Sequence, residues 1–239
     1  MMKKILLCVC ILLCIVGWGP LNLSALHAFF QDTYGEYNLS SQSWIQQAVL
    51  KISMQASNLD PRVLKVGLIA YLNARHRGLD NKEVLTLVDY SKPSIERRLW
   101  VIDVKNLKVL FNTWVAHGKN SGAVNATSFS NRPGSLKSSL GVFLTDNTYI
   151  GDKGYALRIK GLEDQNNNAF DRNIVVHGAP YVGADVVKNN HMLGRSFGCF
   201  AVSPQVIKPL INTIKDKTLM VAYYPDEAWL KHSTFTRST

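Results

Sequence analysis

Apolar residues recur at three- and four-residue steps in the first part of the chain, and this spacing predicts helices. Residues 43–52 follow it, and Ser43 can cap the helix. Asp60-Pro61 supplies a cap and a first-turn proline for a second helix, which ends before Gly78. The apolar run over residues 84–88 predicts a short third helix. The region up to residue 90 is therefore expected to be a helical prefix.

From residue 91 onward, short β-branched and aromatic runs alternate with turn residues, which predicts strands. Two runs predict a hairpin about Lys105-Asn106, and Ser203-Pro204 begins a late helix that Pro209 must bend or shorten. The predicted strands cover residues 99–104, 107–115, 141–145, 155–160, 173–176 and 219–224. We expect a mainly β (α+β) domain over residues 91–239, a sandwich or partly closed barrel with one late helix.

The first 28 residues have the pattern of an export segment. Lys3 and Lys4 precede an almost wholly apolar run from Ile5 to Trp18. This run is shorter than the roughly 17–25 residues of a membrane span. The pattern predicts a signal peptide over residues 1–28, a prefix over 29–90 and a periplasmic protein. An uncleaved segment, which would associate the protein with the inner membrane, is the alternative.

The amino-acid composition and net charge limit the kinds of molecule that the protein can bind. The chain has 239 residues, 46% of them hydrophobic and 18% charged, which is typical of one soluble globular domain of good size. The net charge is +10, which favours polyanions such as a carboxylate-rich cell wall or simply gives a soluble basic surface. The export pattern and the scattered basic residues argue against nucleic acid as a partner.

The cysteines point to chemistry at one position. Cys8, Cys10 and Cys14 lie in the export segment, so the exported protein keeps only Cys199. Cysteines in an oxidising compartment are normally paired, which makes a lone thiol a candidate nucleophile. The alternatives are a buried small hydrophobe, or a zinc site with His177 and either His191 or His117. The chain has no Cys-x-x-Cys or His-Glu-x-x-His motif, and we expect no metal and no cofactor.

The residues around Cys199 fit acyl transfer. Gly198 permits a tight turn, and the N–H groups of residues 197–199 can point at a developing oxyanion. A thiol also needs a base, and His177 is the best placed because it ends an apolar strand and is followed by Gly178. The other candidate neighbours are His191, His117 and Arg195.

The segment His177-Gly178, a loop, and then Gly194–Cys199 (GRSFGC) resembles the active-site signature of the murein L,D-transpeptidases. That signature is a histidine, a spacer and then Ser/Thr-His-Gly-Cys. The chain is most similar to a Gram-negative variant branch of the family. Further similar blocks follow in the family's order at Asp89–Ser94, Val115–Gly118, Phe129–Asn131, Ser138–Gly141 and Leu157–Glu163.

The resemblance implies Cys199 as nucleophile, His177 as general base and the Gly178 carbonyl as the group that orients the imidazole. It implies an oxyanion hole from the N–H groups of Phe197, Gly198 and Cys199. The reaction would be acyl transfer between peptidoglycan stem peptides, donor and acceptor, through a thioester. Expected substrate contacts are Arg195, Ser196, His191, Ser138 and Ser139.

Some of these substrate contacts have plain structural alternatives. Arg195 can form a surface salt bridge, His191 can be a solvated loop residue, and the Ser138-Ser139 pair can be a simple turn.

The chain departs from the main branch of the family at two positions. Phe197 replaces a histidine, and Ala201 replaces an arginine, which leaves Arg195 or Arg172 to recognise a carboxylate. The product then depends on what resolves the thioester: an amine gives a transpeptidase, whereas water gives a carboxypeptidase or endopeptidase. A catalytically silent peptidoglycan-binding protein is the third possibility.

Overall fold

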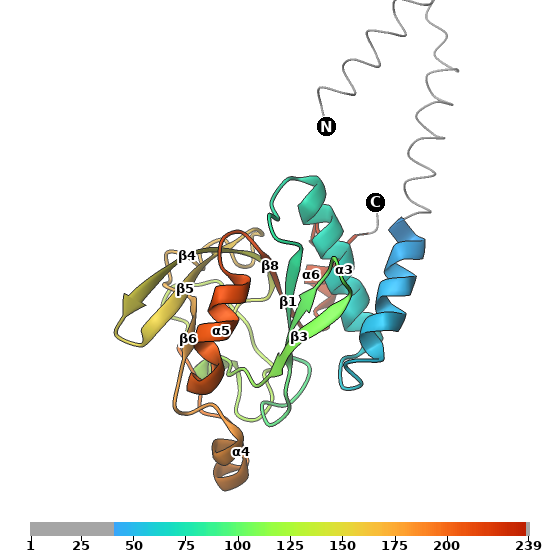
Figure 1. The fold of residues 1–239 in the computed structure, drawn as a ribbon. Coiled ribbons are helices and arrows are strands. Elements are labelled where there is room, and N and C mark those ends of the chain that lie inside the picture. Colours follow the sequence, from blue (N-terminus) through green and yellow to red (C-terminus); the bar gives the residue numbers. More distant parts are fainter. Residues whose placement is uncertain (1–40, 238–239) are drawn as a thin grey trace, which may run out of the picture. The chain divides into compact units, whose positions relative to one another are not determined.

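The structure, a computed structural model, describes residues 41–237 (Figure 1). From Trp44 onward the chain forms one compact unit. The export segment expected over residues 1–28 and its three cysteines lie outside the described residues. Within them, none of the helices combines the length and the apolar character needed to cross a membrane.

One eight-stranded sheet organises this unit, in the order β3-β2-β1-β8-β4-β5-β6-β7. The strands are β1 Val84–Asp89, β2 Leu99–Asp103, β3 Lys108–Thr113, β4 Gly141–Gly151, β5 Gly154–Gly161, β6 Val175–Gly178, β7 Phe200–Val202 and β8 Leu219–Tyr223. The β1/β8 and β6/β7 pairs are parallel and the others are antiparallel. Ala116, which follows β3, bridges to Ala201 in β7, so the two ends of the sheet meet. The expected mainly β, partly closed fold is confirmed.

Helices cover both faces of the sheet. The described helices are one over residues 41–53, α3 Pro61–His76, α4 Ala184–Asn190, α5 Pro204–Ile214 and α6 Glu227–His232, with a 3₁₀ turn η1 at Lys119–Ser121. Of these, α4 buries none of its side chains and lies away from the sheet (Figure 1). The residue 41–53 helix, α3 and α6 pack on one face, where Leu85, Leu87 and Trp100 are buried. On the other face α5 packs over Val88, Phe143 and other buried side chains (Figure 1).

Local signals explain where α3 and α5 begin. The Asp60 side chain accepts a hydrogen bond from the N–H of Arg62, and Pro61 opens α3. The Ser203 hydroxyl accepts from the N–H of Gln205 in the same way, and Pro204 opens α5. Both helices were predicted at these caps, and α5 continues through Pro209 to Ile214.

The helix expected over residues 84–88 is wrong: this run is β1, in the middle of the sheet. Each residue of β1 is buried, because one face packs on α3 and the other on the α5 side. A strand buried on both faces is apolar throughout and lacks the alternation that distinguishes strand from helix. The boundary expected after residue 90 consequently runs through one compact unit.

The hairpin of β2 and β3 and the strands β4, β5, β6 and β8 match the predicted runs, although β4 is longer than expected. The three-residue strand β7 and the short helices α4 and α6 were not predicted. Such short elements carry too few residues for a periodic pattern.

Candidate active site

Cys199 and His177 lie on neighbouring segments at one end of the sheet. Cys199 is in the bend that immediately precedes β7, and His177 in β6 is paired in register with Ala201 in β7. The β6/β7 pairing therefore brings the predicted base within two residues, along the partner strand, of the predicted nucleophile.

His177 is held as a neutral base. Its side chain is buried, and its Nδ1 lies 2.9 Å from the carbonyl oxygen of Gly178. A carbonyl only accepts, so Nδ1 carries the hydrogen and Nε2 keeps its lone pair. Burial lowers the pKa of His177, and the positive charge of Lys153 lowers it further, against the opposing effect of the bond to Gly178. The imidazole is therefore ready to accept a proton near neutral pH.

Cys199 is held as a neutral thiol. Burial raises its pKa, while the N–H of Val175, the positive charge of Arg172 and its own N–H act in the opposite direction. The Sγ donates to the carbonyl oxygen of Asn173 at 3.5 Å. Among the hydrogen bonds of the described residues, none joins this thiol to His177.

A hydroxyl holds the turn that presents Cys199. The Ser196 Oγ donates to the Cys199 carbonyl oxygen at 2.7 Å and accepts from the Gly198 N–H at 3.1 Å. Gly198 has φ 124°, and a Cβ there would lie 2.8 Å from the Lys137 carbonyl oxygen. Ser196 is buried, and both of these hydrogen bonds lie within the turn. The side chain of Phe197, by contrast, is 68% exposed.

Arg172 is the positively charged side chain that lowers the pKa of Cys199. Its guanidinium donates to the carbonyl oxygens of Ser130 at 2.8 Å and Lys137 at 2.7 Å, and to the hydroxyls of Ser139 at 2.7 Å and Ser135 at 3.2 Å. None of the ion pairs within residues 41–237 includes it. A half-buried guanidinium held by neutral acceptors keeps its full charge for an anion beside it.

The two serines expected to touch substrate are buried instead. The Ser138 Oγ accepts from the Gly118 N–H at 3.0 Å. The Ser139 Oγ accepts from Arg172 at 2.7 Å and donates to the Ser130 carbonyl oxygen at 3.0 Å. Their placement favours the structural alternative, in which Ser139 positions Arg172.

Arg195 and His191 lie on the surface beyond the turn. Arg195 donates to the carbonyl oxygens of Lys119 at 3.4 Å and Gly122 at 3.3 Å. His191 is exposed and ends α4 in the left-handed conformation, with φ 53°. The cation beside the thiol is thus Arg172. Sequence alone could not choose between Arg172 and Arg195.

His117 is committed to the interior. Arg98 donates to its Nδ1 at 2.7 Å, so its Nε2 carries the hydrogen and donates to the Gly122 carbonyl oxygen at 3.3 Å. Burial and the Arg98 charge lower its pKa to about 4. With both ring nitrogens engaged, His117 cannot serve as base. Across residues 41–237, no group of three or more His, Cys, Asp or Glu side chains is placed to hold a metal ion.

Tyr181 borders the segment that leads to Cys199, and sequence reasoning missed it. Burial raises its pKa to about 12, and a negative charge on the Cys199 sulfur would raise it further. The side chain lies against Gly194, where a Cβ would approach the Tyr181 Cβ to 2.5 Å. Nothing in the local pattern marks Tyr181, because the loop after β6 brings it back to the turn.

Comparisons with known proteins give the family. No curated protein matches the chain. A solved L,D-transpeptidase from Mycobacterium smegmatis is similar at 15% identity and a TM-score of 0.38, over 59% of each chain. An Enterococcus faecium L,D-transpeptidase is similar at 16% identity and a TM-score of 0.34, over 59% of this chain and 50% of its own. The chain thus spans less than two thirds of these structures.

A family model described as the L,D-transpeptidase catalytic domain matches residues 55–223. The match takes in most of the unit that the structure describes, from the end of the first helix to the end of β8. It includes β6, the turn of Ser196–Cys199 and the loop that carries Arg172. The chain therefore belongs to the L,D-transpeptidase catalytic domain family.

Proposed function

We propose that the protein is an exported cysteine acyltransferase that acts on peptidoglycan stem peptides through a thioester at Cys199. The observation that carries the proposal is the pairing of β6, which holds His177, with β7, which begins directly after Cys199. Membership of the L,D-transpeptidase catalytic domain family supplies the substrate class.

In the first half-reaction, the Cys199 sulfur attacks the carbonyl carbon that joins the third stem residue to the terminal D-alanine. The thiol proton passes to the Nε2 of His177, which the Nδ1 bond to Gly178 leaves unprotonated. The tetrahedral intermediate then collapses and the C–N bond breaks. His177 returns the proton to the leaving amine, D-alanine departs, and the acyl group remains on sulfur.

The negative charge of the intermediate needs donors close to Cys199. The Gly198 N–H already donates to Ser196, which leaves the N–H groups of Phe197 and Cys199 as the oxyanion donors. Arg172 stabilises negative charge on sulfur as the proton leaves, because its guanidinium has no carboxylate partner within the described chain.

In the second half-reaction, an amine of another stem attacks the thioester and restores the thiol. Attack by water instead gives a shortened stem, so a hydrolase uses the same residues and differs in the acceptor. Both reactions take place outside the cytoplasm, which agrees with the export pattern of residues 1–28.

Product analysis tests the proposal. The full chain and its Cys199→Ala variant are each incubated with disaccharide-tetrapeptide, and the products are identified by mass spectrometry. Dimers linked through two third-position residues, absent with the variant, are the expected result. Tripeptide alone would establish the hydrolase. If neither dimers nor tripeptide form, the remaining interpretation is a catalytically silent peptidoglycan-binding protein.

A further inference from the structure

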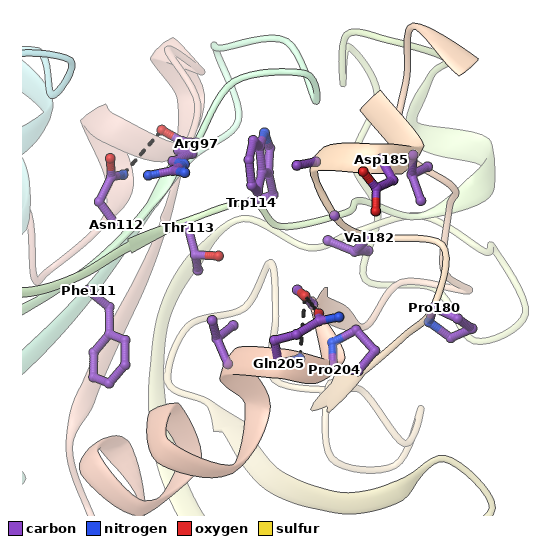
Figure 2. Close-up of a pocket in the computed structure, with 15 residues that line it drawn as sticks. Arg97, Phe111, Asn112, Thr113, Trp114, Pro180, Val182, Asp185, Pro204 and Gln205 are labelled. Carbon is purple, nitrogen blue, oxygen red and sulfur yellow. Dashed lines mark hydrogen bonds between the residues drawn. The ribbon is translucent and has the colours of Figure 1, made fainter. Parts of the chain in front are cut away.

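A cavity of about 550 Å³ lies between the end of β3 and the start of α5, near the bridge that joins the two ends of the sheet (Figure 2). Its walls are the end of β3 with Trp114, the loop that leads into α4, and the first turn of α5. β3 and β7 are the two ends of the sheet, and Ala116 with Ala201 is the bridge that joins them. The cavity has the size of a small-molecule or polymer subsite.

The cavity has apolar walls and a polar rim. The apolar walls include Phe111, Trp114, Pro180, Val182, Pro204 and Val206, and the polar groups are Arg97, Asn112, Thr113, Asp185, Ser203 and Gln205. Trp114 has a fixed orientation, because its indole N–H donates to the Ile95 carbonyl oxygen at 2.9 Å. The Arg97 guanidinium lies 4.7 Å from the centre of the Trp114 ring. A rigid, half-buried indole therefore borders the cavity (Figure 2).

The rim offers donors and acceptors without a net charge. Asn112 donates its amide N–H groups to the carbonyl oxygens of Arg97 and Leu99, both at 3.3 Å, which leaves its Oδ1 for a ligand. Gln205 accepts from the Ser203 hydroxyl through Oε1, which leaves its amide N–H groups. Arg97 contributes one positive charge and Asp185 one negative charge. An apolar wall with a neutral hydrogen-bonding rim fits an uncharged ligand that carries many hydroxyl and amide groups.

The short strand β7 sets the distance between the cavity and Cys199. Ser203, in the cavity wall, follows Cys199 by four residues, and a strand advances ~3.3 Å per residue, so the two lie ~13 Å apart. The loop after β6 links the two places, because Tyr181 packs against Gly194, five residues before Cys199, and Val182 lines the cavity. Three residues of an extended stem peptide span ~10 Å. This is the distance expected between the reacting carbonyl and the sugar that carries the stem.

We propose that this cavity binds the glycan strand of peptidoglycan, a β-1,4-linked chain of N-acetylated amino sugars, with the C–H face of one pyranose ring packed on Trp114. The amide groups of Asn112 and Gln205 bind its hydroxyl and acetamido groups. This inference rests on the proposed function. The cavity would hold the sugar to which a stem peptide is attached, while the other end of that stem reaches Cys199.

Calorimetric titration with peptide-free glycan strands, cut from their stems by an amidase, tests the proposal. The protein is the full chain with Cys199→Ala, so the result does not depend on turnover. Saturable binding is expected, with a loss of roughly tenfold in Trp114→Ala, where the apolar platform is removed. Trp114→Phe keeps an aromatic ring and should retain most of the affinity. Ile150→Ala, at an exposed position in β4, should bind like the parent.

The rim provides a second pair of variants if Trp114→Ala fails to fold. Arg97 and Gln205 are exposed, and replacing both by alanine should weaken binding several-fold without loss of the folded state. No saturable binding by the parent, or equal affinity in the cavity variants, would overturn the proposal. Binding of free tetrapeptide, but not of glycan, at the same residues would overturn it as well. Because the probe is peptide-free, a failed transpeptidase assay leaves this test unaffected.

Discussion

The Nδ1 of His177 lies 2.9 Å from the carbonyl oxygen of Gly178, the next residue in β6. This contact fixes the tautomer of the base without a third side chain, because a backbone carbonyl can only accept. The orientation of the imidazole therefore follows from the path of one strand.

The pH dependence of acylation should report this base. Burial lowers the pKa of His177, and only the neutral ring accepts the thiol proton. Activity should thus persist as the pH falls below the ordinary histidine value of about 6.5 and be lost only when His177 becomes protonated. The measurement is the rate of D-alanine release between pH 4 and 8. An acid limb with its midpoint above 6.5 would contradict the assignment.

The charge of Arg172 should set the reactivity of Cys199. Arg172→Met removes the positive charge and should raise the thiol pKa further, whereas Arg172→Lys keeps the charge and should shift it less. The pH dependence of alkylation by iodoacetamide measures this pKa. Arg132→Met, in the exposed part of the loop that Arg172 contacts, is the control. Equal profiles for the parent and the methionine variant would mean that Arg172 only supports the loop.

Gly198 should tolerate no side chain. Alanine there combines a φ of 124° with a Cβ 2.8 Å from the Lys137 carbonyl oxygen, and should cost ~1–3 kcal/mol or more. Gly134 is the matched control, because it has φ 70° but open space around its Cβ position, so Gly134→Ala should cost about 1 kcal/mol. Urea unfolding compares the two. Equal costs would show that the contact with residue 137 is unimportant.

The helical prefix and the sheet should unfold together. Leu87 in β1 is fully buried against α3, so Leu87→Ala should cost about 2–5 kcal/mol. Because residues 44–239 form one compact unit, the loss should appear in one cooperative transition. Far-ultraviolet circular dichroism and tryptophan fluorescence should give coincident unfolding curves. Two separated transitions would restore the boundary expected near residue 90.

A carbapenem should acylate Cys199, since the thiol that attacks a stem peptide can also open a strained lactam. Intact-mass spectrometry should show a single adduct on the parent protein and none on Cys199→Ala. No adduct after long exposure would mean that the thiol is not accessible to such an acyl donor.

The parts of the fold and site that could be predicted are those coded locally. Asp60-Pro61 and Ser203-Pro204 signal two helix starts within a few residues, and both helices begin there. The Gly198 turn and the strand before Gly178 likewise marked the candidate nucleophile and base. β1 was misread because burial on both faces removes the alternation of a strand.

The rest of the site depends on contacts between distant segments. Ser139 lies 33 positions before Arg172 in the chain, and their 2.7 Å hydrogen bond exists only after folding. The burial of Ser138 and the packing of Tyr181 against Gly194 are also tertiary effects. No local pattern distinguishes a serine that binds substrate from one that holds an arginine, so the sequence left both roles open for the Ser138-Ser139 pair.

The most direct measurement is peptide mapping of the full-length protein after rapid acid quench with disaccharide-tetrapeptide. The account predicts a tripeptide-derived acyl group on the peptide that contains Cys199, at a level that falls when His177 is replaced by glutamine. An acyl group on another residue, or products formed at the parent rate by Cys199→Ala, would contradict it.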